Sequence, residues 1–590
     1  MKRAVKISLR VVGVLIVLFL ITSLGVTFYV KQHQKQFISF LESETEKELN
    51  GATLHVGDIS IGFRGSFPLI ALTIDNISLR DSLWNRHHHS LVSVDQVFAT
   101  VNFWELLHGR IDIQRLDLDK PDIYFYTDSL GYSNTSVFRK KSRTQKDSSA
   151  NQPFPILHIS NARFTIDEGV KHKFFDFRIQ ELNCVIQRSA TSPLLSIDLN
   201  LECKVGSMAF NMEKGAFLEN KSLVGNFNFF YDKESRELNF EKIRLSVDQQ
   251  PFVFTGKFFF AKEGTPFLLS WETRNLSFRK AVSFLSANLQ EKLKTYDIED
   301  SIDSLTGSLD NSETKYPTPL IHLWLRVENR NIKSPFIAID HVSFKATFNN
   351  EAVKMRGHED SNTEIRFSGF RGDWKNLNFY SDSINLSNLI HPKIKMNLTS
   401  DFDLNGINPF LKENSFSFTR GTGKINLAYS GSLDKEYDLS RLLTGNITLS
   451  NADIHYLPKN VHFAPVSGLV HFNGKDMSVE NLTLHAGSSD LTMNGTIKSI
   501  FYFINHLNEK YSLDWSIRSN RLNLEDFSNY FRKQSNSLVP EKNKSSPNRT
   551  ISSYISKITS ADFNISLKVK KLIYKKINRG QFAGKPWNQK

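Results

Sequence analysis

Three consecutive histidines, His87, His88 and His89, carry side chains that could bind a metal ion. Imidazole nitrogens are common zinc ligands, but adjacent residues cannot all reach one ion, and no group of carboxylates or cysteines lies near them in the sequence. Metal binding and a solvated loop are therefore the two interpretations of this triplet. The sequence favours the solvated loop.

The two cysteines, Cys184 and Cys203, are too few for a disulfide framework or a zinc site. They fall on the two arms of an expected β-hairpin that turns near Ser192 and Pro193. Two alternatives remain for them: a disulfide across the hairpin, or two separate buried thiols. The sequence favours the separate thiols.

Catalytic motifs are absent from the sequence. It has no phosphate-binding loop, no HExxH zinc motif, no nucleophile-elbow pentapeptide and no dinucleotide-binding glycine fingerprint. Most aspartates and glutamates fall at polar positions of alternating segments, where solvation explains them. We therefore expect no catalytic residue, no metal and no cofactor, and a protein that is not an enzyme.

The positive charge is concentrated at one end of the chain. The formal net charge is +13, yet residues 541–590 hold twelve Lys or Arg and only two acids. A phosphate-binding face spread over the rest of the chain is not supported, which argues against a nucleic-acid partner. For the basic end, a solvated strand and loop is favoured over contact with phosphate or anionic lipid.

The chain alternates apolar and polar residues over long stretches, as half-buried strands do. In the stretch FVFTGKFFF, every second residue is apolar or glycine, so Phe252, Phe254, Phe258 and Phe260 should share one face of a strand. Residues 195–205 alternate in the same way. Such strands suit an antiparallel sheet with one apolar and one wet face.

A short pattern, apolar-x-apolar-x-Gly-x-apolar, recurs along the chain. It includes Leu427 and Tyr429 before Gly431, and Leu491 and Met493 before Gly495. Glycines at 369, 431 and 495 are spaced almost evenly, which predicts several strands per repeat in an elongated array. A glycine inside a strand usually marks a bend or bulge, so a bend in each repeat would curve the sheet.

The N-terminus predicts a membrane anchor. An uncharged apolar segment begins at Val11 and ends at Val30, long enough as a helix to cross a bilayer. Residues 1–10 form a basic flank, which places the N-terminus in the cytoplasm and the rest on the far side. A cleaved signal peptide is the alternative, but no small-residue cleavage pattern ends the segment.

Helices and polar segments divide the remainder. We expect short helices at residues 34–50, 279–294 and 523–533, the second covering part of the sheet. The predicted regions are a flank at 1–10, an anchor at 11–30, an N-terminal region at 31–138, a polar linker at 139–153, a repeated β-sheet region at 154–533, a second polar linker at 534–553 and a basic β segment at 554–590.

The N-terminal part of the chain contains a VGDISIG strand, Phe67-Pro68, VNFWELLHGRI at residues 101–111, and Asp128-x-x-Gly131-x-x-Asn134. With these features it resembles the AsmA-like proteins of Gram-negative bacteria. Residues 449–497 resemble the family's C-terminal repeats. The resemblance implies a single-pass inner-membrane protein with most of its chain in the periplasm, built as a long curved β-sheet related to chorein-type bridge-like lipid-transfer proteins.

The predicted fold is therefore mainly β: one transmembrane helix, then an elongated, curved, repeated antiparallel sheet shaped as a groove, with few short helices. The resemblance implies that phospholipid acyl chains lie in the groove and move between inner and outer membrane. The expected lining residues are Phe252, Phe254, Phe258, Phe260, Leu427, Tyr429, Leu491 and Met493. A closed two-sheet core would bury the same residues.

The rival functions are an assembly factor for outer-membrane proteins or envelope polymers and, more weakly, a glycan-acting enzyme.

Overall fold

The computed structural model describes the chain in segments. These are residues 28–62, 69–102, 104–105, 112–138, 153–189, 192–261, 266–312, 316–335, 337–375, 377–411, 416–433, 442–499, 511–528 and 561–574, apart from residues 29, 30, 33, 37, 40, 44 and 317. The chain divides into two compact units, unit 1 (Met1–Leu323) and unit 2 (Trp324–Lys590).

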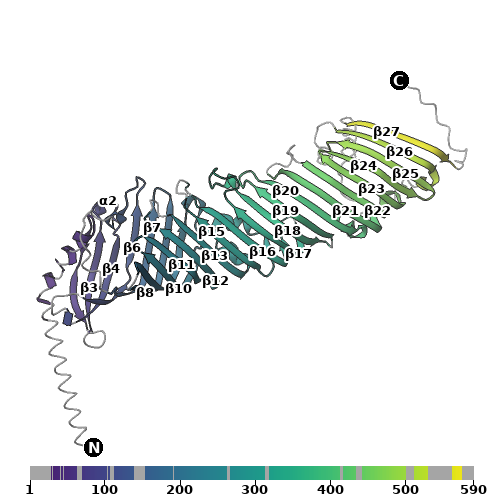
Figure 1. Ribbon diagram of the computed structural model, residues 1–590. Coiled ribbons are helices and arrows are strands. Elements are labelled where there is room, and N and C mark those ends of the chain that lie inside the picture. The colour runs from purple at the N-terminus through teal and green to yellow at the C-terminus, as the bar shows by residue number, and fades with distance from the viewer. Residues whose placement is uncertain are drawn as a thin grey trace, which may run out of the picture. The chain divides into compact units, whose positions relative to one another are not determined.

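Both units are mainly β, with few short helices, as the sequence predicts (Figure 1). The strands of unit 1 are β1 (Thr53–His55), β2 (Asp58–Gly62), β3 (Leu69–Arg80), β4 (Val92–Asn102), β5 (Ile113–Asp119), β6 (Asp122–Thr127), β7 (Ile156–Glu168), β8 (Lys173–Arg188), β9 (Leu194–Ala209), β10 (Ser222–Asp232), β11 (Glu237–Val247), β12 (Gln250–Phe259), β13 (Phe267–Leu276), β14 (Asp297–Ile298) and β15 (Ile302–Asp310). The boundary between the units falls inside β16 (Leu320–Lys333), where the sequence shows no linker.

Unit 2 follows the same plan. Its strands are β17 (Ala338–Asn349), β18 (Glu364–Trp374), β19 (Leu377–Ser387), β20 (Lys393–Asp403), β21 (Phe416–Ser432), β22 (Leu442–Tyr456), β23 (Val461–Gly474), β24 (Asp476–Ala486), β25 (Ser489–Lys498), β26 (Tyr511–Asn523) and β27 (Ala561–Ile573). From β17 to β26 each strand pairs antiparallel with the next one in sequence. In Figure 1 the neighbouring strands of each unit lie side by side in a single layer.

Among the described strands, three pairs are parallel, so the sheet is mixed and the expectation of an antiparallel sheet holds only in part. In unit 1, β5 and β6 both pair parallel with β7, and in unit 2, β26 pairs parallel with β27. Parallel neighbours need a long connection because the chain must return to the same end of the sheet. The two polar segments predicted as linkers, residues 139–153 and 534–553, lie within these connections.

The alternation in β9 places its side chains as predicted. The register pairs Leu199 with Phe227 of β10 and with Cys184 of β8, and directly paired residues point to the same face of a sheet. The alternate residues, among them Asp198 and Asn200, point to the other face. The strand therefore has one apolar and one polar face because its sequence has a period of two.

The repeated glycines do not mark one bend per repeat. Gly369 of β18 has a positive φ of 60° and lies at a bulge, where the pairing with β17 shifts register. Gly431 pairs with Ile394 in a regular part of the register between β20 and β21, whereas Gly495 pairs regularly with Trp515 of β26 but lies where the pairing with β24 shifts register. Two strands, β19 and β20, lie between the first two glycines and three, β22 to β24, lie between the next two, so the even spacing does not correspond to one structural repeat.

Helices occupy the predicted places, and the two after the first are shorter than predicted. Among the described residues, those at 31–48 are helical, and the chain turns at Gly51, whose φ is +69°. The segment predicted at 279–294 forms two helices, α4 (Phe278–Ser283) and α5 (Ala287–Leu293), and that at 523–533 begins with a single 3-10 turn, η6 (Leu524–Phe527). In the part of the chain that the structure describes, no helix is both long and apolar enough to cross a membrane. The predicted anchor lies outside the described residues, apart from Phe28.

Candidate functional site

A continuous apolar face runs across the strands of unit 1. Starting from Phe254 of β12, the register leads to Ile243 of β11 on one side and to Trp271 of β13 on the other. Following paired residues strand by strand extends the same face from β3 to β15. We call this surface the apolar face of unit 1; its residues on β9 to β13 are Leu195, Ile197, Leu199, Leu201, Cys203, Leu223, Phe227, Phe229, Tyr231, Leu238, Phe240, Ile243, Leu245, Phe252, Phe254, Phe258, Phe267, Leu269 and Trp271.

Aromatic rings form a connected track on this face. Ring centroids of Phe227 and Phe229 are 5.6 Å apart, and Phe229 meets Phe240 at 5.4 Å. Phe240 then neighbours Phe258 at 6.2 Å, and Phe258 neighbours Phe267 at 5.6 Å. The rings come from four consecutive strands, β10 to β13, so the track runs across the sheet, perpendicular to the strands.

Burial falls steadily along β12. Phe252 is 6% exposed, Phe254 and Phe258 are half-buried, and Phe260, just past the end of the strand, is 41% exposed. The buried end lies under the helices: the rings of Phe252 and Phe284, the residue that ends α4, are 6.1 Å apart. On β12 the face is therefore covered at one end and exposed at the other.

The N-terminal end of the face is also covered. Ile38 and Leu41, from the helical segment that follows the predicted anchor, pack against Val56 and Ile59. Beside them, Ala52, Leu91 and Val137 form a second buried cluster. With this end and Phe252 covered, Phe254 and Phe258 on the central strand β12 remain half-buried.

Several glycines on the apolar faces make room for aromatic rings of the neighbouring strand. A side chain at Gly256 would overlap the ring of Phe240, its direct partner on β11. The same holds in three further pairs: Gly307 with Trp271, Gly423 with Phe402, and Gly495 with Trp515. An aromatic ring over a cross-strand glycine is a recognised means of fixing register. Sequence reasoning singled out Gly256 and Gly495 and expected a bend or bulge there, but it did not foresee the facing rings and did not single out Gly423.

Unit 2 has an apolar face of the same kind. Leu427 pairs with Leu398, Tyr429 with Met396, and Met493 with Ile517. All the predicted lining residues of this unit are half-buried. Leu491 and Met493 pack against a buried cluster of Leu404, Ala452, Val466 and Leu484, beneath the 3-10 helix η4 (Leu404–Phe410). As in unit 1, a short helical segment covers part of the face.

The two cysteines are buried free thiols. Cys184 pairs with Leu199, whereas Cys203 pairs with Ile179, five residues from Cys184 along β8. At roughly 3.3 Å per strand residue, that offset is about 16 Å, far beyond the reach of a disulfide. Burial raises the pKa of both thiols, that of Cys203 to about 11. The prediction of two separate buried thiols is therefore confirmed, and the alternative of a disulfide is wrong.

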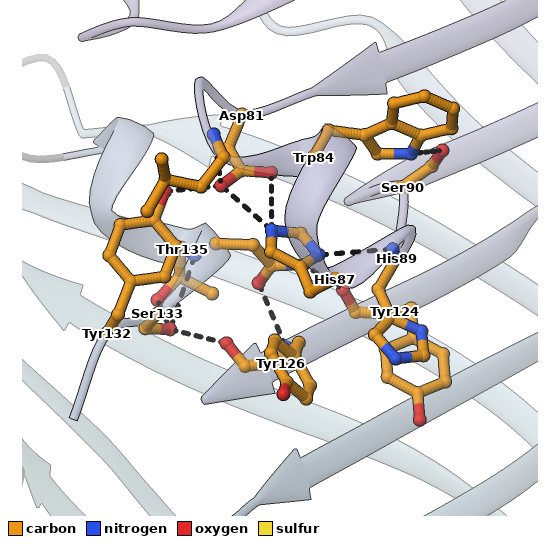
Figure 2. A network of polar contacts seen from close by, with 12 residues as sticks. Asp81, Trp84, His87, His89, Ser90, Tyr124, Tyr126, Tyr132, Ser133 and Thr135 are labelled. Carbon is orange, nitrogen blue, oxygen red and sulfur yellow. Dashed lines mark hydrogen bonds and ion pairs between the residues drawn. The ribbon is translucent and has the colours of Figure 1, made fainter. Parts of the chain in front are cut away.

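A polar network surrounds two of the three histidines, His87 and His89, in unit 1 (Figure 2). The Asp81 carboxylate, fully buried, lies 3.0 Å from Nε2 of His87 and also accepts a hydrogen bond from the Tyr132 hydroxyl. The backbone N–H of His89 donates to Nδ1 of His87 at 3.1 Å. Only His88 is exposed, so the solvated-loop prediction is wrong for the other two.

The second half of the network is an aromatic stack. The His89 ring stacks on Tyr124 at 4.3 Å, and the Tyr124 hydroxyl donates to Asp167 at 3.1 Å. Burial lowers the pKa of His89, with a further contribution from His87, and burial raises the pKa of Tyr124 to about 12. Both groups are therefore neutral near pH 7.

The network joins chain segments and offers no reactive group. Both ring nitrogens of His87 already have partners, so this imidazole has no nitrogen left to accept a proton from a substrate. Asn134, fully buried, donates to the Tyr124 carbonyl oxygen and accepts from the Tyr126 backbone N–H. The network therefore fastens η1 (Asn134–Phe138) and α2 (Trp84–His87) to β6. Within the described segments, no group of His, Cys, Asp and Glu could hold a metal ion.

The fold and the site define a class of protein: a β-sheet protein with half-exposed apolar faces. The AsmA family model matches residues 1–317, more than half of the chain, and the chain belongs to the AsmA family. No curated protein and no solved structure matches the chain. The matched range ends before residues 449–497, so the resemblance of that segment to the family's C-terminal repeats remains a prediction.

Proposed function

We propose that this AsmA-family chain is an inner-membrane-anchored periplasmic protein of cell-envelope biogenesis that binds phospholipid acyl chains on its apolar faces. In the envelope it would convey phospholipids between the inner and outer membranes. The observation that carries this proposal is the partial exposure of the aromatic rings in the middle of unit 1, where Phe254 and Phe258 lie between paired strands on both sides and remain half-buried.

An acyl chain is the ligand that best fits such a face. Each methylene group moved from water to an apolar surface contributes about 0.8 kcal/mol, so a long tail gains affinity from a continuous strip without any specific polar contact. The headgroup can stay in water at the exposed end of β12, where Phe260 lies 41% exposed. Binding of this kind needs no catalytic residue and no cofactor.

The test is a paired measurement on the full-length protein. Phe254→Glu and Phe258→Glu place a charge on the apolar face, and Thr255→Glu places the same charge on the opposite face of β12, where Thr255 is exposed. Lipid bound per protein is measured by mass spectrometry, with folding followed by circular dichroism. Lipid held by the predicted anchor is the same in all variants and cancels in the comparison.

Reduced lipid with retained folding in the two Phe variants, and unchanged lipid in Thr255→Glu, supports acyl-chain binding. Unchanged lipid in folded Phe variants rejects the face as a lipid site and favours the alternative, a non-enzymatic assembly factor for outer-membrane proteins or envelope polymers. Loss of folding in both Phe variants would show that the rings belong to a closed core, because a buried unpaired charge costs several kcal/mol.

A further inference from the structure

The last described strand, β27, differs from the other strands of unit 2 in its surroundings. Among the described strands, only β26 pairs with it residue by residue, so its other edge presents backbone N–H and C=O groups without a strand partner.

Several large apolar side chains on β27 and just after it are more than half exposed. Ile565 is 61% exposed, Leu567 is 56%, Leu572 is 58% and Tyr574 is 57%, against 6% for Phe252 on β12. Successive residues of a strand point to opposite faces, so these side chains project from both faces of the edge. The edge is therefore apolar mainly on the face that carries Ile565 and Leu567, and Leu572 adds one apolar side chain to the opposite, largely polar face.

Basic side chains alternate with the apolar ones. Lys568, Lys570 and Lys571 are exposed, and the register places Arg518 beside Lys568 and Arg521 beside Lys571. No ion pair joins these three lysines to a carboxylate within the described segments. Beyond Asp562, residues 563–590 contain eight Lys or Arg and no acid.

Nearby carboxylates on neighbouring elements have other partners. Asp490 accepts hydrogen bonds from the backbone N–H groups of Asn520 and Arg521, at 3.1 and 2.7 Å. Asp526 accepts from Ser488 and Ser489. The positive charge of the edge therefore remains available to an anionic partner.

We propose that β27 docks on an anionic lipid bilayer, with its apolar side chains in the interface and its lysines at the headgroups. Basic residues near an anionic leaflet are attracted electrostatically, and long lysine side chains can bury their methylene groups while the charge stays at the headgroup level. A second copy of the chain is a poor partner because lysines on the edge repel lysines on the other copy. A soluble polyanion would explain the lysines but not the exposed Ile565 and Leu567.

The inference is independent of acyl-chain transport and has its own experiment. The full-length protein is carried in discs of neutral phosphatidylcholine and mixed with vesicles of phosphatidylcholine alone or of phosphatidylcholine with phosphatidylglycerol. Capture of discs by vesicles is measured by co-sedimentation. Capture should require phosphatidylglycerol and should weaken as salt is raised.

The test variant is Lys568→Gln with Lys570→Gln and Lys571→Gln, and the matched control is Lys204→Gln with Lys242→Gln and Lys345→Gln, three exposed lysines on other strands. The test variant should lose on the order of a hundredfold in affinity, since each lysine near an anionic surface contributes roughly fivefold. The control should bind like the unmodified protein.

Equal capture by neutral vesicles, or an equal loss in the control variant, would overturn the inference. Competition by polyphosphate as effective as that by phosphatidylglycerol vesicles would also overturn it and indicate a polyanion site. Even if the triple variant folds poorly, the salt dependence of vesicle capture by the unmodified protein tests whether the attraction is electrostatic. Loss of capture with unchanged lipid per protein separates this inference from the acyl-chain proposal.

Discussion

Replacing Gly256 by alanine tests the pairing of glycines with aromatic rings. The new Cβ would lie closer than 3.0 Å to three atoms of the Phe240 ring. Phe240 is 7% exposed, and its ring also contacts Phe229 and Phe258, so it cannot move aside freely. The substitution therefore forces an overpacked arrangement into the middle of unit 1.

The expected magnitude follows from two opposing effects. Alanine is better than glycine in a strand by about 0.5–1 kcal/mol, because glycine loses more conformational freedom on folding. Overpacking a well-packed site costs about 1–3 kcal/mol. Gly256→Ala should therefore destabilise the protein by roughly 1 kcal/mol. In a Phe240→Ala background the clash is absent, so the same substitution should stabilise by roughly 0.5–1 kcal/mol.

The assay is a double-mutant cycle on the full-length protein. Hydrogen exchange of peptides from β11 and β12 reports the local free energy of opening, and urea unfolding gives the stability. Gly256→Ala should lower the free energy of unfolding of the unmodified protein and raise that of the Phe240→Ala variant. The same double-mutant cycle on Gly495 and Trp515 tests a second glycine–aromatic pair, in unit 2. If Gly256→Ala stabilises the unmodified protein, or acts equally in both backgrounds, the ring does not require the glycine.

Three further predictions concern the anchor, the thiols and the histidine stack. A reporter active only outside the cytoplasm, fused after Asn50, should be active while the protein keeps its N-terminus; a soluble product beginning near residue 30 would contradict the anchor. Cys184 and Cys203 should resist alkylation at pH 8 until the protein unfolds, because burial raises their pKa values; rapid labelling of the folded protein would show that they are accessible. His89 has a lowered pKa, so the unfolded chain binds its proton more tightly, and the free energy of unfolding should fall as the pH drops below about 6.5. His89→Phe keeps the stack and should reduce that fall in urea-unfolding experiments; an unchanged pH dependence would assign it to other groups.

Much of the local structure could be predicted from residue order alone. Alternation in residues 195–205 fixed which side chains of β9 share a face, because a strand has a period of two whatever it packs against. The helical segment before Gly51 could be predicted in the same way, since its apolar spacing and its stop are local features. The predicted lining residues, such as Phe254 and Leu427, point to the apolar faces for the same reason.

Tertiary structure decided what those local patterns meant. The sequence shows a glycine at 256 but not the ring of Phe240, because cross-strand pairing depends on register between segments that the chain order does not align. Cys184 and Cys203 sit on adjacent strands as expected, yet register separates them. His87 is buried because Asp81 and Tyr132, the latter far along the chain, meet it in space. Parallel pairing of β26 with β27 likewise depends on a long connection, which residue periodicity cannot reveal.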